Sequence, residues 1–174
     1  MARSKVFLRT RDIDWALDIG GRYIHVASAG GDLPIIVEDR LFDIWRELKD
    51  SPIVCLERDV ILNEQYLKEK FANVADEGPV AGALREEWYV HSFKAMAMRG
   101  FYSFDRDIRT PFDKSVYHLV AKPGNMSQAV HYNLPVVNLR IEVEQLDGRD
   151  IVRLINEVNN RLYECQRDRS VASA

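Results

Sequence analysis

The clearest hydrophobic pattern lies at residues 14–28, where two alternating segments flank Gly20-Gly21. Alternation with a period of two is typical of a β-strand, and a glycine pair between two such segments favours a two-residue hairpin turn. Because the turn fixes the register, His25 should lie opposite Ala16. One predicted face carries the apolar side chains Trp15, Leu17, Ile19, Ile24 and Val26, with Arg22 at the turn end. The other face carries Asp14, Ala16, Asp18, Tyr23, His25 and Ala27.

Apolar residues at helical spacing predict three long helices, at about 34–49, 83–98 and 149–164. The apolar side chains of the second helix fall nearly all round its axis, which indicates contacts on more than one side. Residues 63–71 favour a short helix. Residues 75–82 contain several helix breakers and favour a loop.

Alternating or short apolar segments also predict strands at 4–10, 101–104, 115–121 and 136–146, and 53–56 is open to a short strand. The first of these would complete a three-stranded N-terminal meander with the hairpin. The last alternates cleanly, as in an antiparallel sheet with one buried and one wet face. Strict strand–helix alternation is absent. The sequence therefore predicts an α+β fold, an antiparallel sheet with helices packed mainly on one face.

Length and composition favour one globular domain over residues 1–174, with a polar tail that frays from about residue 166. The formal net charge of −3 gives no electrostatic case for nucleic acid or an anionic membrane. No segment approaches the roughly 20 apolar residues of a membrane span, and no secretory signal is recognisable. Cys55 and Cys165 have no metal-site spacing, so we expect two reduced thiols and a cytoplasmic location.

The polar face of the hairpin is the first candidate site. A histidine between two aspartates has its charged form favoured, a setting that general acids and oriented bases use. We therefore take Asp14, Asp18, Tyr23 and His25 as candidate catalytic residues, with the tyrosine as a hydrogen-bond donor. The alternative is an open sheet face whose polar residues simply tolerate water.

The segment Ser28-Ala29-Gly30-Gly31-Asp32 joins the hairpin to the first predicted helix. Its backbone N–H groups at Ser28, Gly30 and Gly31 could hold a phosphate or carboxylate. However, the segment lacks the Lys-Ser/Thr ending of a P-loop, and Asp32 would repel an anion. The alternative is a tight turn in which Asp32 caps the helix.

The run Asp105-Arg106-Asp107, together with His118 and His131, contains oxygen and nitrogen groups that could ligate a metal. Neither histidine belongs to a metal-binding pattern, and Arg106 can neutralise its neighbours. We therefore favour a charged hairpin loop here and predict neither a metal nor a cofactor.

Two functions remain open. The first is a non-catalytic interaction or regulatory protein with an unknown protein partner or self-association, because the chain has ample core but no cofactor fingerprint and no complete catalytic set. The second is a small enzyme or ligand-binding domain with a pocket around His25, Asp14 and Asp18. The second requires these groups to face a concave pocket.

Overall fold

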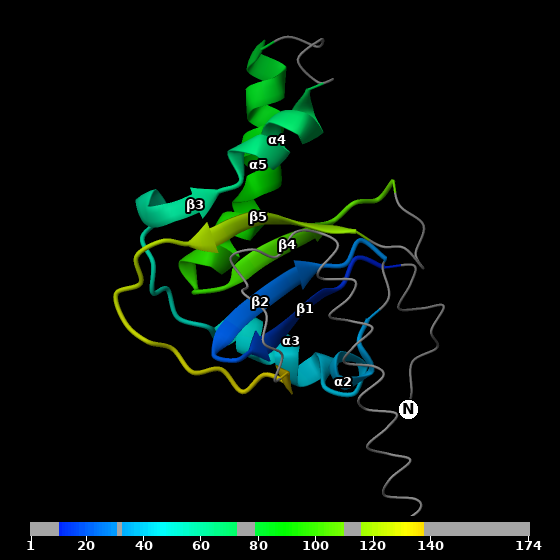
Figure 1. The fold of residues 1–174 in the computed structure, drawn as a ribbon, viewed down its shortest axis with the longest axis vertical. Coiled ribbons are helices and arrows are strands. Elements are labelled where there is room, and N and C mark those ends of the chain that lie inside the picture. The colour runs from blue at the N-terminus through cyan, green and yellow to red at the C-terminus, as the bar shows by residue number, and fades with distance from the viewer. Residues whose placement is uncertain (1–10, 31–32, 73–78, 110–115, 138–174) are drawn as a thin grey trace, which may run out of the picture.

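The computed structural model describes residues 11–30, 33–72, 79–109 and 116–137. In this part of the chain, six strands form one sheet in the order β3-β5-β4-β2-β1-β6 (Figure 1). The strands are β1 (Asp14–Ile19), β2 (Arg22–Ala27), β3 (Val60–Leu62), β4 (Tyr102–Arg106), β5 (Tyr117–Pro123) and β6 (Val136–Val137).

The predicted hairpin is confirmed in both its turn and its register. β1 and β2 are antiparallel, and Ala16 pairs with His25. Gly20 and Gly21 have φ angles of +59° and +87°, in the region that glycine enters without a Cβ clash. The Asp18 carboxylate also closes the turn, because its Oδ1 accepts a hydrogen bond of 2.7 Å from the Gly21 N–H.

The α+β class is confirmed, but the sheet is mixed, so the prediction of a purely antiparallel sheet was wrong. β2 pairs with β4 in parallel, and so does β1 with β6, whereas β3–β5 and β4–β5 are antiparallel. A parallel pair needs a long crossover, and the chain between β2 and β4 supplies one that contains the main helices. Local alternation along a strand carries no information about the direction of its neighbour.

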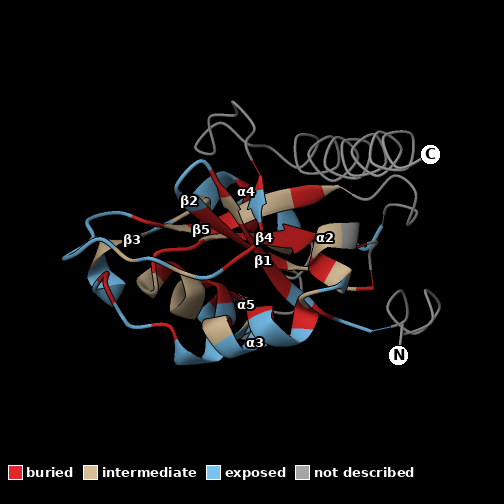
Figure 2. Ribbon diagram, turned by 90° about the horizontal axis from the view of Figure 1, so that it is seen from below, coloured by how far each residue is buried: buried red, intermediate tan, exposed pale blue. Residues whose placement is uncertain are grey.

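The described helices are α2 (Ile35–Glu38), α3 (Leu41–Asp50), the 3-10 turn η1 (Glu57–Asp59), α4 (Glu64–Phe71) and α5 (Pro79–Met98). The predicted helix at 34–49 is thus broken in two, and the helix at 63–71 is confirmed. α5 begins at Pro79, a first-turn position that proline favours, so the predicted loop at 75–82 ends earlier than expected. Figure 2 shows α3 and α5 on the same side of the sheet.

Other strand predictions hold in part. Residues 53–56 form only an isolated bridge, between Cys55 and Met126, and β3 was not predicted. β4 continues past the predicted end at Phe104 to Arg106, which takes Asp105 into the sheet. The predictions for 4–10, for 138–146, for 149–164 and for the tail from 166 lie outside the described residues.

Both faces of the hairpin are buried. Trp15, Leu17, Ile24 and Val26 on the apolar face have no exposed surface, and His25 on the polar face is 2% exposed. A second core cluster lies between α4, α5 and β5. A β-bulge opposite Ser103 and Phe104 lets two consecutive residues, Val120 and Ala121, both join this cluster.

The turn geometry makes a prediction about stability. A Cβ added at Gly20 or Gly21 would meet no atom within 4 Å, so a substitution there tests backbone strain alone. We expect Gly21→Ala to lower the free energy of unfolding by about 1 kcal/mol, as measured by urea denaturation. Gly20→Asn is the control, because asparagine tolerates the left-handed region and should leave stability within about 0.5 kcal/mol. Equal losses in both variants would contradict the turn.

Candidate functional site

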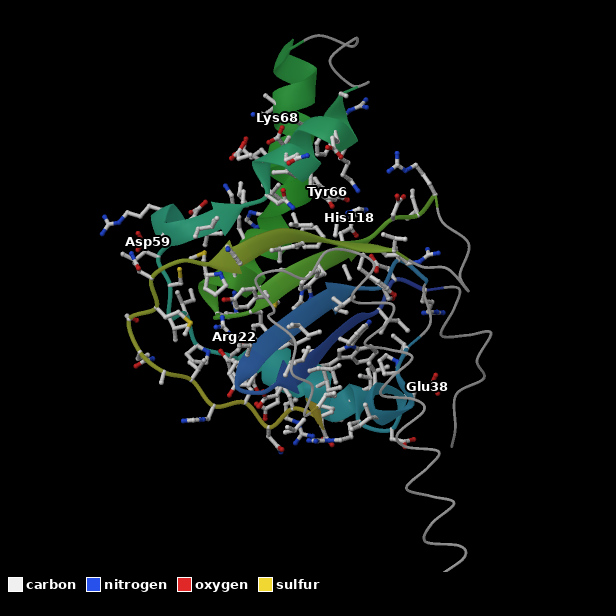
Figure 3. The ribbon with its side chains drawn as sticks, in the orientation of Figure 1. Arg22, Glu38, Asp59, Tyr66, Lys68 and His118 are labelled. Carbon is white, nitrogen blue, oxygen red and sulfur yellow. The ribbon has the colours of Figure 1, made fainter. Side chains whose placement is uncertain are left out.

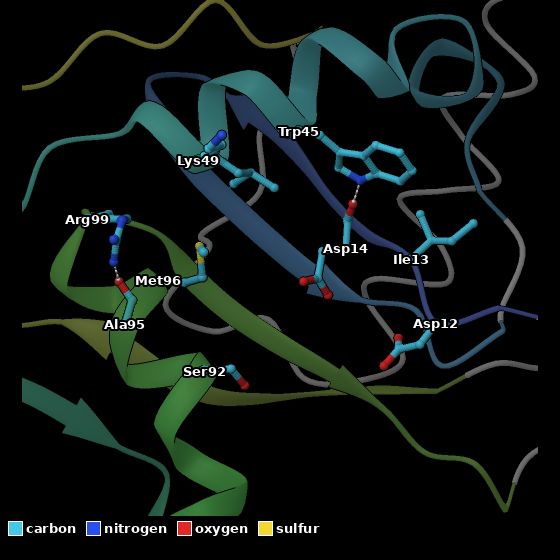
Figure 4. Close-up of a pocket in the computed structure, with 10 residues that line it drawn as sticks. Asp12, Ile13, Asp14, Trp45, Lys49, Ser92, Ala95, Met96 and Arg99 are labelled. Atoms are coloured by element: carbon cyan, nitrogen blue, oxygen red, sulfur yellow. Dashed lines mark hydrogen bonds between the residues drawn. The ribbon is translucent and has the colours of Figure 1, made fainter.

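A groove of about 590 Å³ runs between α3 and α5, with the start of β1 along one side. We call it the α3–α5 groove (Figure 4). Asp12 and Asp14 lie toward one end, and Lys49 and Arg99 lie toward the other. The rest of the lining is mainly apolar and comes from Ile13, Trp45, Leu48, Ala95 and Met96, with Ser92 on α5. In Figure 4, Met96 lies between the two charged ends, whereas Ile13 and Trp45 lie on the acidic side.

The acidic end is held in place by the sheet behind it. The His25 Nε2 lies 3.7 Å from the Asp14 Oδ1, and the His25 Nδ1 lies 2.8 Å from the Ser103 Oγ. The hairpin register places the histidine beside Asp14, and the parallel β2–β4 pairing places Ser103 beside the histidine. On the other side, the Trp45 indole N–H donates a 2.8 Å hydrogen bond to the Asp14 carbonyl. The Asp14 side chain itself remains 55% exposed.

Ser103, His25 and Asp14 follow one another in the order serine, histidine, carboxylate, as in a hydrolytic triad. The solvent exposure of the serine and of the carboxylate is, however, the reverse of that in a triad. In a triad the serine faces substrate and the carboxylate is buried. Here Ser103 has no exposed surface, whereas the carboxylate faces the groove. The buried hydroxyl therefore cannot attack a substrate, and the His25 Nε2 that faces the carboxylate has no hydrogen-bond partner among the described residues.

The basic end is formed by the last turns of two helices. The Arg99 Nη1 donates a 2.7 Å hydrogen bond to the Ala95 carbonyl, which fixes the guanidinium against α5. Among the described residues, the buried Nε of Arg99 has no hydrogen-bond partner. Lys49 is exposed on the last turn of α3.

A second hollow, of about 400 Å³, lies between α4 and the first residues of β5, and we call it the α4–β5 pocket. Beside it, the buried Asp105 carboxylate binds two side chains through one oxygen. Its Oδ2 accepts hydrogen bonds from the Tyr89 hydroxyl, at 2.5 Å, and from the Lys70 ammonium, at 3.0 Å. The ammonium also donates to the Tyr66 hydroxyl, at 3.1 Å, and lies 4.3 Å from the centre of the Tyr89 ring.

The ionisation of this cluster follows from burial and charge. Burial and then the adjacent Asp105 carboxylate raise the pKa of Tyr89, so this hydroxyl stays protonated and donates. Burial disfavours the charge on Lys70, but the attraction of Asp105 outweighs it and raises the pKa of the ammonium. On the loop after β4, hydrogen bonds from the Arg109 side chain lower the pKa of Asp107 to about 2.

The structure brings together two of the four candidate catalytic residues, Asp14 and His25. Of the other two, Asp18 closes the hairpin turn. The Tyr23 hydroxyl donates a 3.1 Å hydrogen bond to the Val130 carbonyl, and its ring lies edge-on to Tyr132. The interpretation as an open, solvated face was wrong for His25, because the crossover that the parallel pairing requires lays helices over this face.

The residues suggested for anion binding lie at a turn. The Ser28 side chain is fully buried, and its Oγ accepts a 3.0 Å hydrogen bond from the Ile13 N–H. Gly30 adopts a φ of +80°, and Gly31 lies outside the described residues. The contacts at Ser28 tie the end of the hairpin to the start of β1.

The structure also brings together part of the group considered for a metal. Asp105 and His118 are cross-strand neighbours, and the His118 Nε2 lies 4.0 Å from the Asp107 Oδ2. The charged-loop interpretation was wrong for Asp105, which lies buried in β4. In the described part of the chain, no three His, Cys, Asp or Glu side chains converge as metal ligands.

The sequence interpretation missed the residues that complete both hollows. Trp45 is one of the apolar residues whose spacing predicts the helix at 34–49 and would be expected to be buried, yet it is 36% exposed and donates to the Asp14 carbonyl. Tyr66 and Lys70 share one face of the predicted short helix, since they are four residues apart, but nothing local marks them as partners of Asp105. Lys49 and Arg99 stand at helix ends, where basic residues are common for electrostatic reasons.

Comparison of the chain with protein-family models, with curated proteins and with solved structures gives no match. The chemistry of the two hollows is therefore argued from their own geometry. Over the residues that the structure describes, none of the helices combines the length and the apolar character needed to cross a bilayer.

The Asp105 cluster makes a second prediction about stability. Tyr89→Phe removes a hydrogen bond to a buried carboxylate and should lower the free energy of unfolding by about 1.5–3 kcal/mol. Tyr102→Phe is the control, because it removes the hydroxyl that accepts a bond from the exposed Arg22, and it should cost less than about 1 kcal/mol. Chemical denaturation at pH 7 measures both. A smaller loss for Tyr89→Phe than for the control would contradict the role of Tyr89.

Proposed function

We propose that this protein is a non-catalytic binding protein whose α3–α5 groove takes a small zwitterionic molecule, such as an amino acid or a dipeptide. One observation carries the proposal. The groove presents carboxylates toward one end and cationic side chains toward the other, and the rest of its lining is mainly apolar, with Met96 between the two ends. A ligand with an ammonium, an apolar middle and a carboxylate matches this order of charges.

The acidic end supplies acceptors for an ammonium group. An ammonium has three donor hydrogens, and the carboxylates of Asp12 and Asp14 line the same end of the groove. The Asp12 Oδ1 already accepts a 2.9 Å bond from the Ala29 N–H, which fixes its position. Asp14 is backed by His25, so one carboxylate oxygen can face the imidazole while the other faces the groove. A ligand ammonium would thus meet two carboxylates at this end of the groove, one of them fixed by the Ala29 N–H.

The basic end supplies donors for a carboxylate. Because Arg99 is tied to the Ala95 carbonyl through Nη1, the rest of its guanidinium is held in one orientation. With Nε buried and Nη1 bonded to Ala95, Nη2 is the nitrogen of Arg99 that can donate to a ligand carboxylate, and the Lys49 ammonium adds a mobile charge at the rim.

Groove size and lining limit the ligand to a small molecule. A volume of about 590 Å³ falls within the range of small-molecule sites. The side chains of Leu48, Ala95 and Met96 offer an apolar surface to the middle of the ligand. Methionine adapts to ligands of different shape, so the groove should accept several apolar side chains.

Binding rather than catalysis is favoured because the serine hydroxyl that contacts His25 does not reach the groove. Ser103 is buried behind His25, and His25 itself is covered. A regulatory protein whose ligand controls an interaction with a protein partner or a second copy of the chain fits this arrangement, and we assign no surface to that interaction. A cytoplasmic location is part of the proposal, and the free, buried thiol of Cys55 suits a reducing compartment.

The experiment is a titration calorimetry panel with ligands that lack one charge at a time. Leucine, glycyl-leucine, leucinamide (no carboxylate) and N-acetyl-leucine (no ammonium) are titrated into the full chain. We expect both zwitterions to bind at least about tenfold more tightly than either capped ligand, because each end contributes a charge-assisted contact.

Variants then assign each end of the groove. Asp14→Asn should weaken the binding of leucine by about tenfold and leave the affinity for N-acetyl-leucine unchanged. Lys49→Ala should weaken the binding of leucine and leave the affinity for leucinamide unchanged. Asp50→Asn is the matched control for Asp14→Asn, because it makes the same substitution at an exposed position of α3, next to Lys49, that does not line the groove. The proposal fails if no zwitterion binds in the millimolar range, or if the capped ligands bind as well as leucine.

A further inference from the structure

Three cationic or hydrogen-bond-donating side chains meet at the α4–β5 pocket from three different elements. Lys70 comes from α4, His118 from β5, and Arg109 from the loop that follows β4. Figure 3 shows Tyr66 and His118 close together at this end of the sheet. Their rings stack at 4.6 Å with an angle of 18°, so the histidine is held by an aromatic neighbour.

The acceptors of this pocket are already engaged. Both carboxylate oxygens of Asp107 accept 2.9 Å hydrogen bonds from the Arg109 side chain. The Asp105 Oδ2 is shared by Tyr89 and Lys70. The remaining acid of the lining, Glu69, accepts a 3.2 Å bond from Gln65.

The donors, in contrast, are only partly engaged. Lys70 has three ammonium hydrogens and uses two of them, on Asp105 and Tyr66. Arg109 uses Nε and Nη2 on Asp107, which leaves Nη1. His118 donates no hydrogen bond to a described residue, and its nearest acidic oxygen, on Asp107, is 4.0 Å away. The pocket therefore offers donors to a ligand and few acceptors.

These donors are also prearranged, which lowers the entropic cost of binding. The Asp107 carboxylate holds the Arg109 fork, and the Tyr66 ring holds the imidazole. Lys70 is fixed by Asp105 and by the faces of two tyrosine rings, at 4.3 Å from Tyr89 and 5.5 Å from Tyr66. The raised pKa of Lys70 keeps this group charged at neutral pH.

We propose that the α4–β5 pocket binds a phosphate-type oxyanion, independently of the zwitterion groove. Three donors that approach from three elements suit the tetrahedral spread of phosphate oxygens better than the two coplanar oxygens of a carboxylate. The paired acids cancel most of the net charge around the pocket. Recognition therefore rests on directed hydrogen bonds rather than on a general attraction for anions.

The ligand could be inorganic phosphate or the phosphate group of a small ester, because both present the same oxygens. Ile108 also lines the pocket and is 74% exposed, so an ester would have an apolar neighbour that inorganic phosphate does not use. Tighter binding of an ester than of inorganic phosphate would identify a phosphate ester as the ligand of the pocket, and equal binding would identify inorganic phosphate as the ligand.

The test is titration calorimetry of the full chain with inorganic phosphate, phenyl phosphate and acetate, at constant ionic strength. We expect both phosphates to bind and acetate to bind at least about fivefold more weakly, because two coplanar oxygens match three spread donors less well. The proposal is overturned if neither phosphate binds in the millimolar range, or if acetate binds equally well.

Four variants separate the site from general electrostatics and from folding. Arg109→Ala and His118→Phe should each weaken the binding of phosphate by at least about fivefold. The phenylalanine keeps an aromatic ring stacked on Tyr66. Asp107→Asn should weaken binding less than Arg109→Ala does, because it removes a negative charge near the phosphate as well as the contact that holds Arg109. Lys68→Ala is the charge-matched control, since Lys68 is exposed on α4 outside the pocket.

Two results for these variants would overturn the oxyanion site. One is an equal loss of phosphate affinity in Lys68→Ala and Arg109→Ala, which would show a general effect of charge. The other is a loss in Asp107→Asn as large as that in Arg109→Ala, which would show that the Asp107–Arg109 pair only supports the loop. Thermal unfolding of each variant confirms that it is folded. Binding in the α3–α5 groove, measured with leucine, should be unchanged in all four.

Discussion

The parallel pairing of β2 with β4 is the constraint on which the rest of the described structure depends. It joins the N-terminal hairpin to the second half of the sheet. In its register His25 pairs with Ser103, and Ala27 pairs with Asp105. A parallel neighbour also requires the chain to leave the sheet and return in the same direction. The helices of that crossover cover the face that carries the ionisable residues, and this converts a polar hairpin face into the wall of a groove.

α5 connects the two hollows. A helix of 20 residues is about 30 Å long, enough to cross a small sheet and extend beyond its edge. Its last turn contributes Met96 to the groove, Arg99 follows directly after it, and its middle contributes Tyr89 to the Asp105 cluster. In Figure 1 its N-terminal half extends with α4 past β5. The two sites thus share a scaffold, yet each has its own charged groups.

The sequence predicted local structure well and long-range pairing poorly, for a physical reason. The double glycine at 20–21 determines a turn through its own backbone freedom, so the hairpin and its register could be derived. The direction of β4 relative to β2 depends on packing across the crossover, which no local pattern encodes. For the same reason Asp14 and His25 could be placed together, whereas the partners of Asp105 on two helices could not. The burial of Ser103, which excludes it as a nucleophile, likewise follows only from the assembled sheet.

The chain has three tryptophans, and the described structure places them in three distinct surroundings. Trp15 is fully enclosed in the sheet, Trp88 is 83% exposed on α5, and Trp45 lies at the groove with its indole N–H bound to a carbonyl. Indole emission depends on the polarity of its surroundings, so the intrinsic fluorescence of the native protein is a sum of blue-shifted and red-shifted components. Of the three, only Trp45 lines the groove, which makes it a natural optical reporter of groove occupancy that needs no attached dye.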